Sequence, residues 1–179
     1  MQMPKGSAIT KTEAADAIYV ISRISGEGAD RKAEPGDYYL SEQEEEELKA
    51  ITECYDNTIV ILNVGGVMDV SFLEKYNIAA LVMLSQAGME GGNALADVLS
   101  GAVTPSGKLT DTWGCHYEDY PSSATFSHNN GNIIEEKYYE GIYVGYRYFD
   151  SFEVEPRYPF GYGMSYTTFD VATENAAWK

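Results

Sequence analysis

Apolar and polar positions fall in blocks along this chain, and three of the apolar blocks have the length of a β-strand. They cover Asp16–Ser22, Thr58–Val64 and Ile78–Ser85 and are rich in valine, isoleucine and leucine. Near-continuous apolar runs of this length are typical of strands that are covered on both faces, as in a parallel sheet. The pattern therefore predicts three buried parallel strands.

Helical signals lie between these strands. Ser41 and Glu44 have the spacing of a capping box, which predicts a helix from Ser41 to about Tyr55 with acidic residues in its first turn. A shorter helix is expected over Asn93–Ser100, closed by Gly101. The alternation of strands and helices predicts an α/β fold, with helices flanking a mainly parallel sheet as an α/β sandwich.

Each predicted strand is followed by a loop that contains glycine, and the first of these loops carries a carboxylate, Glu27, between two glycines. If the strands are parallel, the three loops open on the same edge of the sheet, where such sheets bind ligands, and should converge. Gly26 and Gly28 could also begin a dinucleotide fingerprint. The third glycine is missing, however, and Arg31 stands where that turn needs a small residue, so a nucleotide site is not expected. Taken alone, Glu27 could equally be a solvated acid in a plain turn.

Composition and charge narrow the class of protein. The 179 residues, 44% of them apolar, are enough for one core, and no apolar stretch is long enough to span a membrane. A formal charge of −16 disfavours nucleic acid and anionic membranes as partners. Cys54, Cys115, His116 and His128 lack metal-ligand spacing, so neither a metal site nor a disulfide is expected. With no visible signal peptide, a reducing, cytoplasmic location is expected.

Six segments, in order along the chain, carry recognisable motifs. The first is Ser22–Arg31, which contains Glu27. The others are Thr58–Val67, Gly88–Gly101, the PSGKL segment Pro105–Leu109, and the closing pair Tyr139–Asp150 and Pro159–Thr167. They are spread over most of the chain and resemble segments of the C-terminal-type α/β-sandwich domain of family 3 glycoside hydrolases, the β-glucosidase and β-xylosidase family.

The resemblance implies roles for the charged groups of the first loop. It gives Glu27 the role of general acid/base in retaining hydrolysis of β-glycosides, with Asp30 as the fallback because the loop varies in length. Asp30 and Arg31 are expected to order the loop as partners through a charge-assisted hydrogen bond. Glu90, on the third loop, is expected to be structural. No substrate-binding residue is identified, and no cofactor is implied.

The resemblance also implies that further parts are needed. Family 3 enzymes place the nucleophilic aspartate on a barrel domain of roughly 250 residues, for which this chain has no room. We therefore expect residues 1–168 to be a sandwich domain that is incomplete at its N-terminus, and residues 169–179 to be a tail or the start of another domain. The chain is expected to serve a larger β-glycosidase with a β-glucoside or related carbohydrate as substrate, and to be inactive alone. A non-catalytic carbohydrate-binding or structural fragment is the alternative.

The closing segment Tyr138–Tyr166 is unusually rich in tyrosine, and with 113–132 it is expected to be irregular. Its rings could form a platform for a sugar, because a pyranose face is apolar enough to stack on an aromatic ring. They could instead form a wall packed on the sandwich, as the resemblance implies. In that structural interpretation Arg147 and Asp150 form a local ion pair.

Overall fold

The computed structural model of the chain describes residues 9, 11–24, 30–128, 134–135 and 137–174. Its central feature is a sheet of three parallel strands in the order β1-β2-β3. The strands are β1 (Asp16–Ser22), β2 (Asn57–Asn63) and β3 (Ala80–Met83). The prediction of three parallel strands is confirmed, with the second shifted by one residue and the third shorter than expected.

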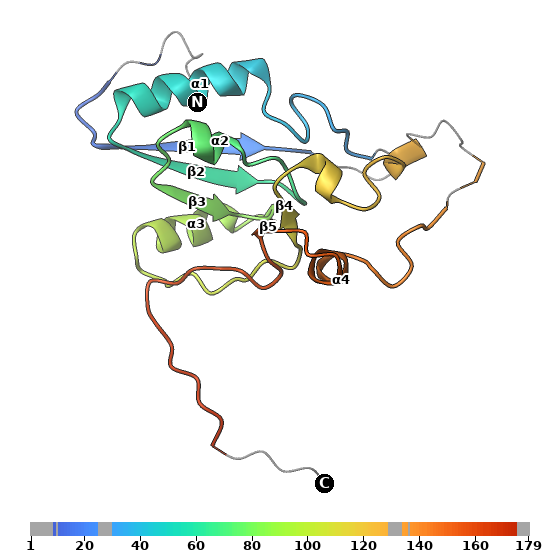
Figure 1. Cartoon of the computed structure of the whole chain (residues 1–179). Coiled ribbons are helices and arrows are strands. Elements are labelled where there is room, and N and C mark those ends of the chain that lie inside the picture. The colour runs from blue at the N-terminus through green and yellow to red at the C-terminus, as the bar shows by residue number, and fades with distance from the viewer. Residues whose placement is uncertain (1–8, 10, 25–29, 129–133, 136, 175–179) are drawn as a thin grey trace.

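Three helices belong to this half of the fold, namely α1 (Glu42–Cys54), α2 (Phe72–Lys75) and α3 (Gly91–Leu99). Figure 1 shows α1 and α3 on opposite sides of the sheet. The predicted capping box is present, since the Ser41 and Glu44 side chains each accept from the other residue's backbone N–H, at 3.2 and 2.8 Å. Helix α3 begins two residues earlier than predicted, and Gly101, just past its end, has the left-handed φ of +77° that its C-terminal turn requires.

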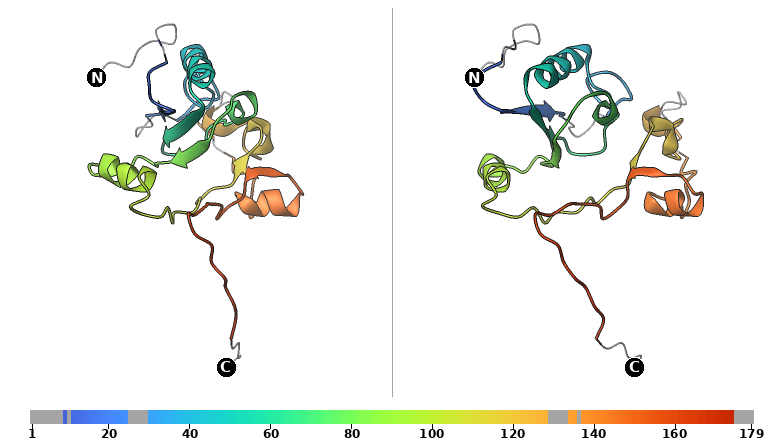
Figure 2. Two further views of the ribbon diagram at one scale, coloured as in Figure 1. Left: turned by 90° about the vertical axis from the view of Figure 1, so that its left-hand side faces the viewer. Right: turned by 60° about the vertical axis from the view of Figure 1, so that its left-hand side comes forward.

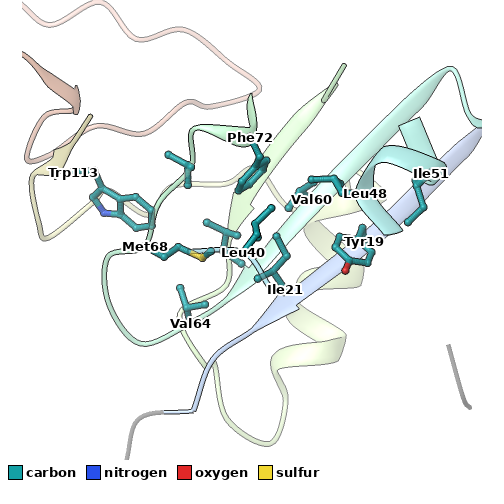
Figure 3. Packing of buried hydrophobic residues seen from close by; sticks show 12 residues of the cluster. Tyr19, Ile21, Leu40, Leu48, Ile51, Val60, Val64, Met68, Phe72 and Trp113 are labelled. Carbon is teal, nitrogen blue, oxygen red and sulfur yellow. The ribbon is translucent and has the colours of Figure 1, made fainter. Parts of the chain in front are cut away.

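The core lies between α1 and the sheet. Figure 3 shows Leu48 and Ile51 of α1 gathered with side chains of β1 and β2, while Trp113 packs beside Met68 at one end of the cluster. The expectation that every strand is covered on both faces is wrong for β1. Its Ile18 and Val20 are 52% and 42% exposed, because only the alternate side chains of that strand face α1.

The closing half of the chain is more regular than expected. It contains the antiparallel pair β4 (Trp113–Gly114) and β5 (Pro156–Tyr158) and the short helix α4 (Tyr146–Ser151). In Figure 1 these elements lie beyond the carboxyl ends of the parallel strands, and in both views of Figure 2 the last described segment runs away from the rest of the fold. Short 3₁₀ turns at Tyr117–Asp119 and Phe126–His128 connect β4 to the tyrosine-rich segment. None of the helices in the described part of the chain combines the length and apolar character needed to cross a bilayer.

Candidate functional site at the carboxyl edge of the sheet

The loops that follow the three parallel strands meet at one edge, as predicted. The Gln86 side chain, beyond β3, donates from Nε2 to the Arg23 carbonyl oxygen, beyond β1, at 2.9 Å. The Arg31 guanidinium, in the loop after β1, donates from Nη1 to the Val67 carbonyl oxygen, beyond β2, at 2.7 Å. Side-chain bonds to main-chain atoms therefore join the first loop to both of the others.

Arg23 anchors the start of the first loop. Its side chain is buried, and its guanidinium donates hydrogen bonds to both carboxylate oxygens of Glu44, at 2.7 and 2.8 Å. The same group donates to the backbone carbonyls of Ser22, Asp37 and Tyr39 at 2.7 to 3.2 Å. A bidentate pair of this kind is strong and directional. It joins the end of β1 to the first turn of α1, and the bonds to Asp37 and Tyr39 join it to the part of the loop just before α1.

Arg31 anchors the other side of the loop, with a partner that differs from the expected one. Its Nε donates to the Asp37 carboxylate at 2.6 Å, and Nη2 donates to the Asp37 carbonyl at 2.8 Å. The Lys32 backbone N–H donates to the same carboxylate at 2.6 Å. The prediction that Arg31 orders the loop is confirmed, but the prediction of Asp30 as its ion-pair partner is wrong. The long Arg31 side chain reaches across the turn to Asp37 instead of pairing with its exposed neighbour.

Both carboxylates in this frame are held in the charged form. Partial burial opposes the charge on Glu44, but hydrogen bonds from Arg23 and Ser41 outweigh it and lower the pKa of the Glu44 carboxyl. At Asp37 burial again opposes the charge, and the bonds from Lys32 and Arg31 lower the pKa of the carboxyl. Each arginine charge of the loop is therefore balanced by a neighbouring carboxylate.

Glu27, the predicted acid/base, lies in segment 25–29, outside the described residues, as do the two glycines beside it. The segment is bracketed by the anchored residues Arg23 and Arg31. Asp30, the alternative candidate for the acid/base, directly precedes Arg31 and is exposed. Glu90 is also exposed and accepts from the Asn93 side chain at 2.6 Å in the first turn of α3, which agrees with a structural role.

Sequence reasoning missed three residues of this frame: Arg23, Asp37 and Gln86. An arginine directly after a buried strand, four residues before the candidate acid, was a usable signal for the first. Glu44 was recognised only as a helix cap, although it also forms the ion pair with Arg23. The bond from Gln86 joins residues 63 positions apart in the sequence, and no local pattern indicates it.

Two surface hollows of about 350 Å³ each lie near α2 and share His116 in their walls. Each hollow is lined by an ion pair, Glu74 with Arg157 in one and Glu45 with Lys75 in the other. Cys54 and Cys115 are free thiols, and the second lines a hollow. Among the described residues, no three His, Cys, Asp or Glu side chains are grouped so that they could hold a metal ion.

The tyrosine-rich segment is only partly the packed wall that was expected. Phe149 of α4 is buried and Tyr158 packs against the core, whereas Tyr138 is 89% exposed and Tyr166 is 61% exposed. Several rings contact one another instead, as in the pairs Tyr143–Phe152, Tyr146–Phe160 and Tyr148–Phe152. Within the described structure Arg147 and Asp150 form no ion pair, so that prediction is wrong. The Arg147 guanidinium lies 5.7 Å from the centroid of the Tyr146 ring.

Comparison with known proteins gives a consistent match. The model of the glycosyl hydrolase family 3 C-terminal domain matches residues 3–166. Beta-glucosidase A of Butyrivibrio fibrisolvens is 42% identical over 86% of this chain and 21% of its own length. A beta-glucosidase of Ruminococcus albus is 38% identical over 97% of this chain and 18% of its own length.

Solved structures agree with the sequence comparison. Beta-glucosidase 3B from Thermotoga neapolitana, solved in complex with glucose, superposes with a TM-score of 0.81 at 44% identity, covering 86% of this chain and 22% of that one. A beta-glucosidase from Paenibacillus barengoltzii gives a TM-score of 0.78 at 42% identity, covering 91% of this chain and 18% of that one. The chain thus spans about a fifth of the length of these relatives.

Proposed function

This chain belongs to the glycosyl hydrolase family 3 C-terminal domains, and from that premise we propose that it supplies the general acid/base of a retaining β-glycosidase acting on β-glucosides. The relatives named above are β-glucosidases, which supports glucose as the sugar. Retaining hydrolysis needs two carboxyl groups about 5–5.5 Å apart, one as nucleophile and one as acid/base. In our proposal Glu27 is the acid/base, and the nucleophile comes from a barrel domain.

The observation that carries this proposal is the anchoring of both sides of the Glu27 segment at the carboxyl edge of the sheet. Arg23 and Arg31, which flank the segment in the sequence, are held by charge-assisted bonds to Glu44 and Asp37. Ligands bind at this edge of open α/β sheets. A carboxyl group presented there could approach a sugar held by another domain.

The ion pairs that Arg23 and Arg31 form with carboxylates are also compatible with acid catalysis. An unpaired guanidinium near Glu27 would favour its ionised form and lower its pKa, which would remove the proton needed by the leaving group. Here each guanidinium is balanced by a carboxylate, Glu44 or Asp37. The two ion pairs therefore leave no uncompensated guanidinium charge at Arg23 or Arg31, the residues that flank the proposed acid in the sequence.

In the proposed reaction Glu27 first donates its proton to the glycosidic oxygen as the bond to the anomeric carbon breaks. The nucleophile of the barrel forms the covalent glycosyl intermediate in the same step. Glu27, now ionised, then takes a proton from water as that water attacks the anomeric carbon. The second step returns the acid to its starting form and releases the sugar with its β configuration retained.

The test uses a complete enzyme, namely Thermotoga neapolitana beta-glucosidase 3B in which this chain replaces the matching domain. We refer to it as the reconstituted enzyme. Glu27→Gln keeps the shape of the side chain but removes the proton donor. We expect kcat/KM for phenyl β-glucoside to fall about 10²- to 10⁴-fold and that for 2,4-dinitrophenyl β-glucoside to change little, because only the poor leaving group needs protonation.

Azide provides the second arm of this test. Because the anion needs no base, it should raise the turnover of the Glu27→Gln variant with the activated substrate and yield β-glucosyl azide. The matched control is Asp30→Asn, which should show neither the dependence on leaving group nor the azide effect. Equal losses on both substrates with no azide product would contradict the assignment of Glu27.

A further inference from the structure

The hydrogen bond from Gln86 crosses the whole carboxyl edge of the sheet. Strand β2 lies between β1 and β3, so the loops after β1 and β3 belong to strands that are not neighbours. Adjacent strands are about 4.8 Å apart, and the Gln86 side chain therefore reaches over the end of β2 to meet the Arg23 carbonyl at 2.9 Å. The Gln86 side chain is exposed, and it nevertheless donates a hydrogen bond to a main-chain carbonyl of a distant strand end.

The backbone at this point is held in an uncommon conformation. Ser85 and Gln86 have φ values of 56° and 51°, which lie in the left-handed region that residues other than glycine rarely adopt. Two such residues in succession persist only where surrounding contacts hold them. They turn the chain sharply after β3, and the Gln86 bond to Arg23 is a contact that this turn makes possible.

The atom that Gln86 holds belongs to the residue on which the first loop depends. The Arg23 side chain is fixed by Glu44, and its carbonyl, at the entrance to the segment that carries Glu27, is fixed by Gln86. Glu27 follows four residues later in the sequence. Arg23 is thus held by two elements: helix α1 binds its side chain through Glu44, and the loop after β3 binds its main-chain carbonyl through Gln86.

From this arrangement we infer that Gln86 is a positioning residue for the general acid/base: it fixes the Arg23 carbonyl and thereby the direction in which the chain enters the Glu27 segment. The inference rests on the proposed role of Glu27. Gln86 itself takes no part in proton transfer. Its effect is on the alignment of the carboxyl group with the glycosidic oxygen, and a displacement of about 1 Å in such a group can reduce the rate up to 10²-fold.

The test is Gln86→Met in the reconstituted enzyme. Methionine has nearly the same length and the same Cβ, so the shape of the side chain is largely kept while the amide, with the N–H donor that reaches Arg23, is lost. We expect kcat/KM for phenyl β-glucoside to fall about tenfold and that for 2,4-dinitrophenyl β-glucoside to fall less than about twofold. The melting temperature should stay close to that of the parent.

The chain offers a matched control in Gln43→Met. Gln43 is exposed on α1 and donates one side-chain bond, to Glu47 at 2.8 Å, away from the sheet edge. That variant should leave the ratio of the two substrates unchanged. Equal losses on both substrates in Gln86→Met, or a loss explained by a lower melting temperature, would overturn the positioning role.

A double variant separates this inference from the proposal on which it rests. If Gln86 acts through Glu27, adding Gln86→Met to Glu27→Gln should cause no further loss on phenyl β-glucoside, since the acid is already absent. A further tenfold loss would show that Gln86 acts by another route. If Glu27→Gln alone lacks the leaving-group dependence, the acid/base assignment fails. If it shows that dependence and Gln86→Met does not, only the role of Gln86 fails.

Discussion

At the scale of single residues, the clearest constraint in this fold is at Gly163. A Cβ at this position would lie 2.6 Å from the Gly107 carbonyl oxygen and 2.9 Å from Cδ of Lys108. The two segments are held together by bonds between Leu109 and the turn that precedes Gly163, at 2.8 Å in each direction, and by a bond from the Lys108 ammonium to the Gly163 carbonyl. Gly163 of the closing motif therefore sits where the two chain segments approach too closely for a side chain.

Gly163→Ala should accordingly destabilise the fold. The methyl group would push a backbone oxygen aside, at a cost of about 2 kcal/mol, and lower the melting temperature by roughly 5 °C. Gly107→Ala is the control, because a Cβ there meets nothing within 4 Å. The measurement is thermal unfolding of the 179-residue chain followed by circular dichroism. Equal melting temperatures for Gly163→Ala and the parent would mean that the two segments can separate at no cost.

At the scale of elements, the Arg23–Glu44 ion pair connects the end of β1 to the first turn of α1. Glu44→Gln would leave the buried guanidinium without its counter-charge, and breaking such a pair costs about 3 kcal/mol. We expect the urea midpoint of the chain to fall accordingly at pH 7. Glu46→Gln, at an exposed position of the same helix, should change the midpoint little. A similar, small effect for both variants would show that the ion pair adds nothing to the contact between strand and helix.

The same pair predicts a direction of pH dependence. The carboxyls of Glu44 and Asp37 have lowered pKa values in the folded protein, so their contribution to stability is complete above their ordinary values of 4.5 and 3.8. It is lost as the pH falls through the lowered values. Urea midpoints measured from pH 7 to pH 3 should therefore fall more steeply for the parent than for Glu44→Gln. Parallel pH profiles would contradict a stabilising role for this charge.

The elements differ in how far local sequence could predict them. Helix α1 was predicted to within a residue, because its start is fixed by the Ser41–Glu44 box, which is a local signal. The parallel strands were found because apolar runs reflect burial. The partner of Arg31, the bond from Gln86 and the exposure of Ile18 depend on residues distant in the sequence or on the packing of one face, and a local pattern carries no information about these.

At the scale of the whole molecule, the chain carries several exposed aromatic rings and covers only part of the length of its relatives. The exposed rings of the closing segment include Tyr138, Tyr139 and Tyr166, on a chain whose net charge is −16. The chain also spans only about a fifth of its relatives, so a catalytic centre that needs two carboxyl groups can draw on residues outside it.

We therefore expect the 179-residue chain alone not to hydrolyse 4-nitrophenyl β-glucoside. A general acid/base contributes about 10²- to 10⁴-fold, and it has nothing to assist without a nucleophile and a bound sugar. Addition of a separately purified family 3 barrel domain should restore turnover if the two parts associate. With Glu27→Gln in this chain, the mixture should turn over substrate only when azide is added. Turnover by the chain alone that survives repurification but is lost in Glu27→Gln would mean that these 179 residues hold both catalytic carboxylates. The nucleophile would then have to be sought among the exposed acids of the sheet edge, beginning with Asp30 and Glu90.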